Sequence, residues 1–158
     1  MMQRQPRDEF LDSRAFASAV LLEKIVRDAY EKRQSSEVQP LQWSILRYLG
    51  AEGAERCTIV WISSFLGITH APVVRAVQTL QKRGYVSQEV NPDDARSKIV
   101  RLTEKGWLQL NSDPLRVIAQ RIDTFDDDDK IALMTAIKQL ITRGDEVKDG
   151  QDVSYPSG

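Results

Sequence analysis

The sequence predicts a mainly α-helical fold with a small β-sheet, and three observations support this prediction. Between Thr69 and Gly84, apolar residues recur at helical spacing, and polar residues occupy the opposite face. Two short runs that are β-branched or alternate in polarity follow, at Tyr85–Val90 and Lys98–Leu102, as expected for strands. The loop that joins them, within residues 91–98, combines turn-forming residues with positive charge. A helix, a strand, a basic loop and a second strand in this order predict a winged helix-turn-helix.

Length and composition restrict the class of protein. The chain has 158 residues, enough for one domain, with or without an added dimerisation element. Its hydrophobic content of 41% and charged content of 28% are typical of a folded, soluble protein. No apolar run is long enough to span a membrane, and the N-terminus lacks a secretion signal, so we expect a cytoplasmic protein. With one cysteine and one histidine, the chain is expected to hold no disulfide, no metal and no cofactor.

The net charge of −1 is small, but the charges are unevenly distributed. Residues 69–106 contain seven lysines and arginines against four aspartates and glutamates, a net charge of +3. Residues 107–158 contain six against ten, a net charge of −4, and residues 1–68 balance. The positive surplus therefore falls on the predicted winged helix, as a surface that faces phosphate requires, although an excess of this size can also arise by chance.

Two helices are expected in the N-terminal third. Residues 8–33 predict a long amphipathic helix, whose apolar stripe includes Phe10 and needs a partner within the chain or on a second subunit. Pro40 begins the second helix and Gly50 ends it. The core face of this second helix is expected to consist of Ile45, Leu46 and Leu49.

The next two helices have the proportions of a helix-turn-helix. Thr58 begins the short first helix, Gly67 ends it, and the loop before Thr58 can join the wing through a one-residue strand. Thr69 is expected to cap the recognition helix, with Pro72 in its first turn and Gly84 just past its end. Its core face is Val73, Val77 and Leu80. Its polar face is His70, Arg75, Gln78, Thr79 and Lys82.

Two further helices are expected after the wing. Thr103 caps the first of them, which Pro114 kinks or breaks, and Asp126 caps the second. The second carries an apolar seam that we assign to a dimer interface: Ile131, Met134, Ile137 and Ile141. Residues 144–158 are polar and are expected to form a mobile tail.

Four segments resemble the multiple-antibiotic-resistance regulator (MarR) family of bacterial transcription factors: QWSILRYL, TIVWISSFLGI, LQKRGYV and NPDDARSKIVRLTEKG. By position, the resemblance extends over roughly residues 10–143. It implies a winged helix at 40–106, flanked by dimerisation helices at 8–33 and 107–143. It also implies a homodimer that binds a near-palindromic operator in double-stranded DNA. Many family members release DNA when a small, often aromatic, effector binds.

The resemblance assigns DNA contacts residue by residue. Arg96 is the wing-tip arginine that enters a minor groove, and Asp94 pairs with it or caps the loop. Arg75 and Gln78 can read base edges, although phosphate is an alternative for Arg75. His70 contacts a base or phosphate, or is an exposed histidine without that role. Thr69 is better placed to cap the helix and touch phosphate than to read sequence. Contact with the DNA backbone or with solvent is expected for Lys82, Arg83 and Lys98, and Thr79 is a further candidate on the polar face. Two recognition helices are expected in successive major grooves, with half-sites about 10 bp apart.

Several residues leave alternatives open. Ile59, Val60 and Trp61 make the start of their helix unusually apolar, so they pack against the helix at 8–33 or the helix that Thr103 caps, or they line a ligand pocket. Cys57 is either a buried structural residue or an oxidant sensor. The effector pocket has three candidates, which are otherwise ordinary core aromatics: Phe16, Trp43 and Trp107.

Taken together, these features predict a sequence-specific, dimeric DNA-binding regulator, and the resemblance leads us to expect a repressor. No phosphate-binding loop, paired nucleophile and base, or spaced metal cluster appears in the sequence, so we do not expect an enzyme. Two alternatives remain: a winged helix used for contact with another protein, and a regulator that is controlled by a partner rather than by a ligand.

Overall fold

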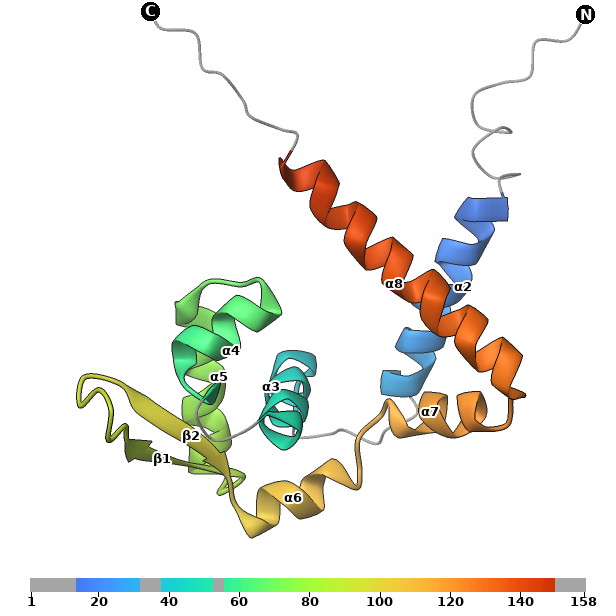
Figure 1. Cartoon of the computed structure of the whole chain (residues 1–158). Helices are drawn as coiled ribbons and strands as arrows, with labels where there is room; N and C mark the ends of the chain where they lie inside the picture. Colours follow the sequence, from blue (N-terminus) through green and yellow to red (C-terminus); the bar gives the residue numbers. More distant parts are fainter. Residues whose placement is uncertain (1–13, 32–37, 53–55, 150–158) are drawn as a thin grey trace, which may run out of the picture. The chain divides into compact units, whose positions relative to one another are not determined.

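The computed structural model describes residues 14–31, 38–52 and 56–149, with side chains in the last helix described up to residue 142. The chain divides into two compact units, residues 1–116 and 117–158, and each is considered by itself. The first unit contains α2 (Arg14–Glu31), α3 (Pro40–Ala51), α4 (Ile59–Leu66), α5 (His70–Lys82), β1 (Val86–Val90), β2 (Lys98–Leu102) and α6 (Glu104–Leu110) (Figure 1). The chain passes into the second unit along α7 (Arg116–Asp123), which α8 (Asp127–Asp149) follows.

The two strands form the predicted antiparallel wing. Val86 pairs with Leu102 and Val90 pairs with Lys98, at the two ends of the ladder. An isolated bridge between Thr58 and Ile99 adds the one-residue strand that the sequence suggested. β1 begins one residue later than predicted because the Tyr85 N–H donates to the Leu80 carbonyl at the end of α5.

The core of the first unit lies between α3, α4, α5 and the wing. The apolar faces predicted for α3 and α5 are both buried, which confirms the helical spacing read from the sequence. α4 contributes Ile62, and β2 contributes Val100 from the opposite side. The largest fully buried side chains of this core are Trp43, Ile45, Leu46, Ile62, Val73, Val77, Leu80 and Val100.

Glycines end both helices of the helix-turn-helix, as predicted. Gly67 and Gly84 have φ angles of 63° and 78°, a conformation that residues with a Cβ rarely adopt. At the other end of α5, Thr69 occupies the N-cap position, but its side chain makes no capping hydrogen bond. The expected cap fails because Pro72, the third residue of the helix, lacks the backbone N–H that such a side chain usually binds.

The C-terminal helices follow the predicted breaks. α6 ends at Leu110 and α7 begins only at Arg116, so Pro114 separates two helices rather than bending one. The Asp126 carboxylate caps α8 by accepting a hydrogen bond of 2.8 Å from the Asp129 N–H. α8 continues through Gly144 to Asp149, beyond the point where we expected a tail to begin, since an interior glycine costs a helix only about 1 kcal/mol.

Among the described residues, no single helix is both long and apolar enough to cross a membrane. α4 and α5 reach that combination of length and hydropathy only when they are counted together, and the chain bends by 118° between them. The predicted interface residue Phe10 lies outside the described residues.

Candidate nucleic-acid interface

The polar face of α5 is exposed along the length of the helix. The side chains of His70, Arg75, Gln78 and Lys82 are all exposed to solvent, as predicted for a helix that reads DNA. Thr79 differs, because it is half-buried and its hydroxyl donates a 2.9 Å hydrogen bond to the Arg75 carbonyl within the same helix. The hydroxyl proton of Thr79 is therefore already used inside α5.

The loop of the wing is closed by its own hydrogen bonds. The backbone N–H of Asn91 donates to the Ser97 carbonyl at 3.1 Å, and the Ser97 N–H donates to the Asp94 carbonyl at 2.9 Å. The Asp94 carboxylate also accepts two bonds from Arg96, from its backbone N–H at 3.1 Å and its side-chain Nε at 3.3 Å. The Arg96 side chain is nevertheless 95% exposed. Asp94 therefore both pairs with the arginine and closes the loop, so that the guanidinium is held outward at the tip.

α5 and the wing share one groove of about 440 Å³. The helix contributes His70 and Gln78 to this groove, and the wing contributes Arg96 and Lys98. Four candidates that were selected separately from the sequence are thus brought together on one concave surface. Such a groove between a recognition helix and a wing suits the phosphate backbone that separates a major groove from a minor groove.

Gln88 also lines this groove, and sequence reasoning missed it. Its side-chain amide donates to the Gln81 side chain of α5, which links β1 to the recognition helix. The strand period places Gln88 on the same face as the buried Val86, and this alternation was the signal that could have identified it.

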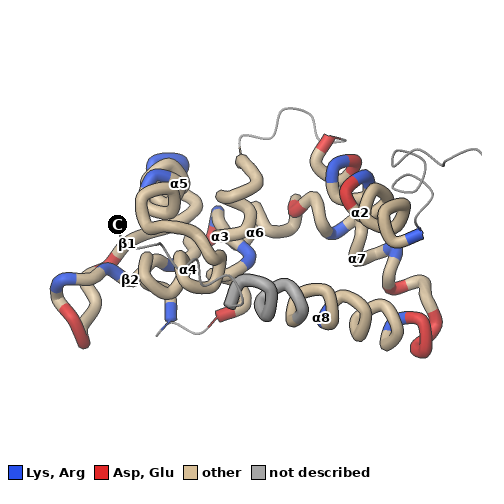
Figure 2. The backbone as a smooth tube through the Cα atoms, turned by 90° about the horizontal axis from the view of Figure 1, so that it is seen from above, with Lys and Arg blue, Asp and Glu red and all other residues tan. Residues whose placement is uncertain are grey.

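The basic residues of segment 69–106 divide into two groups. Arg83, Arg101 and Lys105 have internal partners: Gln42, Glu89 and the carbonyl of Arg83, respectively. The four others have exposed side chains that lie on α5 and on the wing, where Figure 2 marks the lysines and arginines along the backbone. These four are Arg75, Lys82, Arg96 and Lys98. Arg96 also pairs with Asp94 at the tip, yet its side chain stays 95% exposed, so all four cations lie on the surfaces where the sequence predicted contact with DNA.

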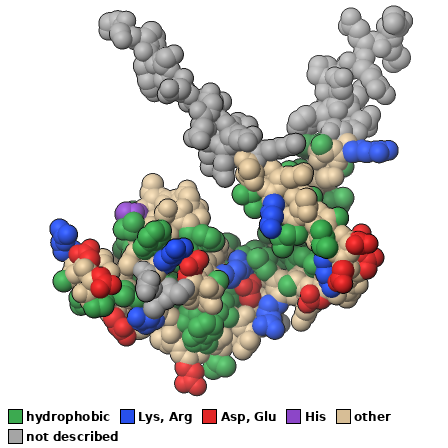
Figure 3. Space-filling view, viewed as in Figure 1, with side chains coloured by type: hydrophobic (Ala, Val, Ile, Leu, Met, Phe, Trp, Pro, Cys, Tyr) green, Lys and Arg blue, Asp and Glu red, His purple; other side chains and the backbone are tan. Residues whose placement is uncertain are grey.

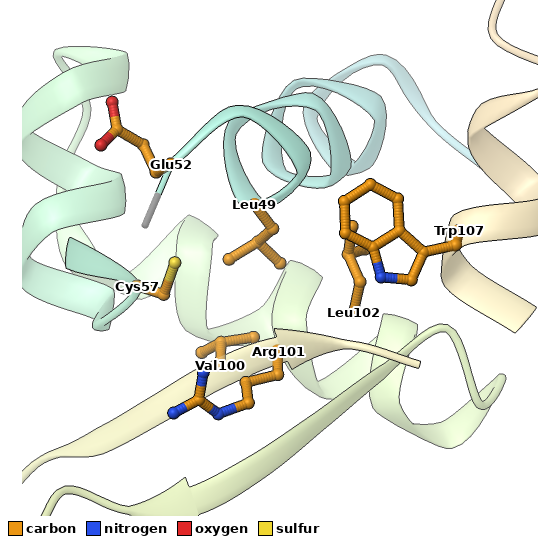
Figure 4. A pocket seen from close by; sticks show the side chains of 7 residues that line it. All are labelled: Leu49, Glu52, Cys57, Val100, Arg101, Leu102 and Trp107. Carbon is orange, nitrogen blue, oxygen red and sulfur yellow. The ribbon is translucent and has the colours of Figure 1, made fainter. Parts of the chain in front are cut away.

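A second pocket of about 280 Å³ lies beside β2 (Figure 4). The Trp107 indole forms one side of it, and the Arg101 side chain and the Cys57 thiol lie toward the other. Trp107 is the one aromatic effector candidate that lines this pocket, because Trp43 is fully buried in the core and Phe16 is half-buried on α2. Trp43 thus takes the place of an ordinary core aromatic, the alternative that the sequence left open for it. Within the described part of the chain, no group of acidic, cysteine or histidine side chains is arranged to hold a metal ion.

Cys57 is 4% exposed, and burial raises the pKa of its thiol. We expect iodoacetamide to alkylate it far more slowly in the native protein than in urea, because both access and the thiolate fraction are reduced. Since the pKa is raised, the native rate should reach half of its maximum at a higher pH than the rate in urea, where the thiol has its ordinary pKa of about 8.5. Mass spectrometry of timed samples measures both rates. Equal native and unfolded rates would instead favour the oxidant-sensor interpretation.

The outer face of α4 differs from expectation. Ile59 is partly buried against the core, but Val60 and Trp61 are exposed rather than packed against α2 or α6. Ile59 and Ile62 turn toward the core at helical spacing, which directs the residues between them outward. The Arg56 guanidinium lies 5.6 Å from the centre of the exposed Trp61 ring. Figure 3 shows that hydrophobic side chains also reach the surface elsewhere on this unit.

Comparison with known proteins supports the assignment of the winged helix. Residues 36–97 match the model of the MarR family. No curated protein matches the chain significantly.

Solved structures share the fold at low sequence identity. The regulator BpsR of Bordetella bronchiseptica is 19% identical, with a TM-score of 0.65 over 83% of this chain and 94% of its own. PcaV of Streptomyces coelicolor, solved with its natural ligand, is 17% identical, with a TM-score of 0.63 over 90% and 98%. MepR of Staphylococcus aureus, solved in complex with DNA, is 15% identical, with a TM-score of 0.65 over 83% and 98%. Residues 36–97 of this chain therefore match the MarR family, and the chain shares the winged-helix fold of solved transcription regulators.

Proposed function

We propose that this protein is a homodimeric repressor that binds a near-palindromic operator in double-stranded DNA. α5 enters the major groove, and the wing at residues 91–98 reaches the adjacent minor groove. The observation that carries this proposal is the groove in which His70 and Gln78 of α5 meet Arg96 and Lys98 of the wing. The DNA complex of MepR supports the proposal by its similarity of fold.

Selection of bound fragments from the source genome, followed by a salt titration, tests this function. We expect enrichment of one near-palindromic sequence and an affinity that falls steeply as salt rises, because bound cations release counterions from the phosphates. Enrichment of no sequence, or an affinity that does not respond to salt, would contradict the proposal.

Homodimerisation is supported by apolar residues that the described chain leaves exposed. Every predicted seam residue of α8 is exposed in the single chain, and so is a second apolar set on α2. The α8 set is Ile131, Met134, Ile137, Leu140 and Ile141. The α2 set is Val20, Leu21, Leu22, Ile25 and Val26. Apolar side chains exposed in such numbers on two helices favour burial against a second copy.

Ile137→Glu is expected to yield a monomer whose affinity for the operator is lower by about a hundredfold. The reason is that a monomer contacts one half-site, whereas a dimer contacts both half-sites at once. Light scattering gives the mass, and fluorescence anisotropy gives the affinity. Gln139→Glu adds the same charge on the opposite side of α8 and serves as the matched control. A dimeric Ile137→Glu protein with unchanged affinity would count against this interface.

A small-molecule effector is a further part of the proposal. DNA binding by BpsR is regulated by 6-hydroxynicotinic acid, and MepR has been solved with ethidium bromide. In this chain, the pocket beside Trp107 offers an aromatic wall and the Arg101 guanidinium, which suit a small aromatic acid. A thermal-shift screen with aromatic acids tests this, with Trp107→Ala expected to abolish any stabilisation.

The exposed face of α4 favours a second candidate function, contact with another protein. Trp61 and Phe65 are large apolar residues that are left exposed beside the helix-turn-helix. A winged helix used only for protein contact would enrich no DNA sequence, so the selection experiment distinguishes the two functions.

A further inference from the structure

One arginine of the winged helix joins three segments of the first unit. Arg47 of α3 forms a two-pronged ion pair with Asp113, from Nε to Oδ2 at 2.6 Å and from Nη2 to Oδ1 at 2.7 Å. The same Nη2 donates to the Tyr30 hydroxyl at 3.1 Å, near the end of α2. Arg47 therefore connects the core helix α3 both to α2 and to the link between α6 and α7.

Asp113 also determines where α7 begins. Its Oδ1 accepts a hydrogen bond of 2.8 Å from the Leu115 N–H, and its carbonyl accepts one of 3.1 Å from the Arg116 N–H. Pro114, between these residues, is fully buried. The carboxylate that holds Arg47 is thus part of the cap of α7, along which the chain passes into its second unit.

The pair is more sheltered than the other ion pairs among the described residues. The side chains of Arg47 and Asp113 are 26% and 10% exposed, whereas in each other pair both side chains are more than a third exposed. Burial by itself lowers the pKa of the Arg47 guanidinium, but the hydrogen bonds with Asp113 and Tyr30 raise it above its ordinary value. The pair is therefore charged at every pH at which Asp113 is ionised, and solvent screens it only weakly.

We propose that Arg47 and Asp113 are positioning residues for DNA binding, and that their ion pair fixes the direction in which α7 leaves the winged helix. This inference rests on the proposed function. If the helices beyond Arg116 join two copies of the chain, the direction of α7 sets the separation of the two recognition helices. A rigid separation restricts tight binding to operators with one half-site spacing, because both helices must fit successive major grooves.

The test compares binding to operators of different half-site spacing. The selected operator and two derivatives, with one or two base pairs inserted between the half-sites, are titrated with full-length protein. For the wild type, each insertion is expected to weaken binding about tenfold or more, since one half-site is lost from the complex. For Arg47→Met, we expect weaker binding to the operator with the native spacing. Its affinities for the three duplexes should differ by less than about threefold. The salt dependence of binding should stay as in the wild type, because no phosphate contact is removed.

Asp113→Asn provides a second variant in case Arg47→Met does not fold. Its amide oxygen can still accept the Leu115 N–H, so the start of α7 is retained while the ion pair is lost. Asp127→Asn is the matched control, because it breaks the exposed Lys130–Asp127 pair at the start of α8 and is expected to keep the wild-type spacing preference. A folded Arg47→Met or Asp113→Asn protein that still discriminates spacing like the wild type would overturn the positioning role alone. A wild type that binds none of the duplexes would overturn the proposed function, and the positioning role with it.

Discussion

Arg96→Ala is expected to weaken binding of the dimer to every DNA sequence by about a hundredfold, corresponding to about 1.4 kcal/mol at each of two wings. The loop around Arg96 is closed by hydrogen bonds, and its guanidinium is 95% exposed at the tip. A cation held in this way can enter a narrow minor groove, where the negative potential is concentrated. Fluorescence anisotropy with the selected operator and with an unrelated duplex measures the loss on both.

Two further variants separate this role from a general effect of charge. Arg121→Ala removes the same charge from an exposed position on α7, and its affinity is expected to stay within about threefold of the wild type. Asp94→Ala removes a negative charge, so that simple electrostatics predicts tighter binding, whereas loss of the Asp94–Arg96 contact predicts weaker binding. Unchanged affinity in Arg96→Ala, or tighter binding in Asp94→Ala, would contradict the assigned role of the wing.

Gly106→Ala is expected to destabilise the winged helix by about 3 kcal/mol. A Cβ at this position would overlap the carbonyl oxygen of Tyr85 and would lie 3.1 Å from Cδ2 of Leu102. The Tyr85 carbonyl cannot simply move away, because it accepts the Thr103 N–H at 3.1 Å. Urea unfolding at fixed protein concentration gives the free energy of unfolding, and the melting temperature should fall by about 10 °C.

Gly50→Ala is the matched control for this effect. Its added Cβ would meet Cδ1 of Leu110 at 2.9 Å, at the far end of a flexible side chain that can rotate away. Alanine is also favoured over glycine inside a helix by about 1 kcal/mol, so the stability should change little. Equal losses in the two variants would show that the contact between Gly106 and Tyr85 is not the cause.

The helices and strands of the first unit could be predicted from the sequence because apolar spacing and glycine positions act within a few residues of the chain. The apolar spacing of Val73, Val77 and Leu80 allows only one face of α5 to be buried, and all three are in the core. Gly67 and Gly84 could be placed at helix ends because the chain there requires positive φ angles. The cap at Thr69 failed for a reason that was present in the sequence, since Pro72 removes the N–H that a cap would bind.

The candidate site was predictable residue by residue but not as an arrangement. His70, Gln78, Arg96 and Lys98 were each selected for their chemistry, and the packing of the wing against α5 brings them into one groove. Arg47 and Asp113 are 66 residues apart, and helical or strand periodicity carries no information about such pairings. The outward direction of Trp61 was missed for a related reason, because hydrophobicity alone does not tell which apolar residues a helix leaves exposed.

The hydrogen bonds within the wing also have a kinetic consequence. Because Asn91, Asp94 and Ser97 close the loop before any DNA is present, no segment of the tip has to become ordered on contact. Association is then expected to occur at a rate set by diffusion and charge, almost independently of the duplex sequence. Discrimination between duplexes should therefore be found in how long each complex lasts.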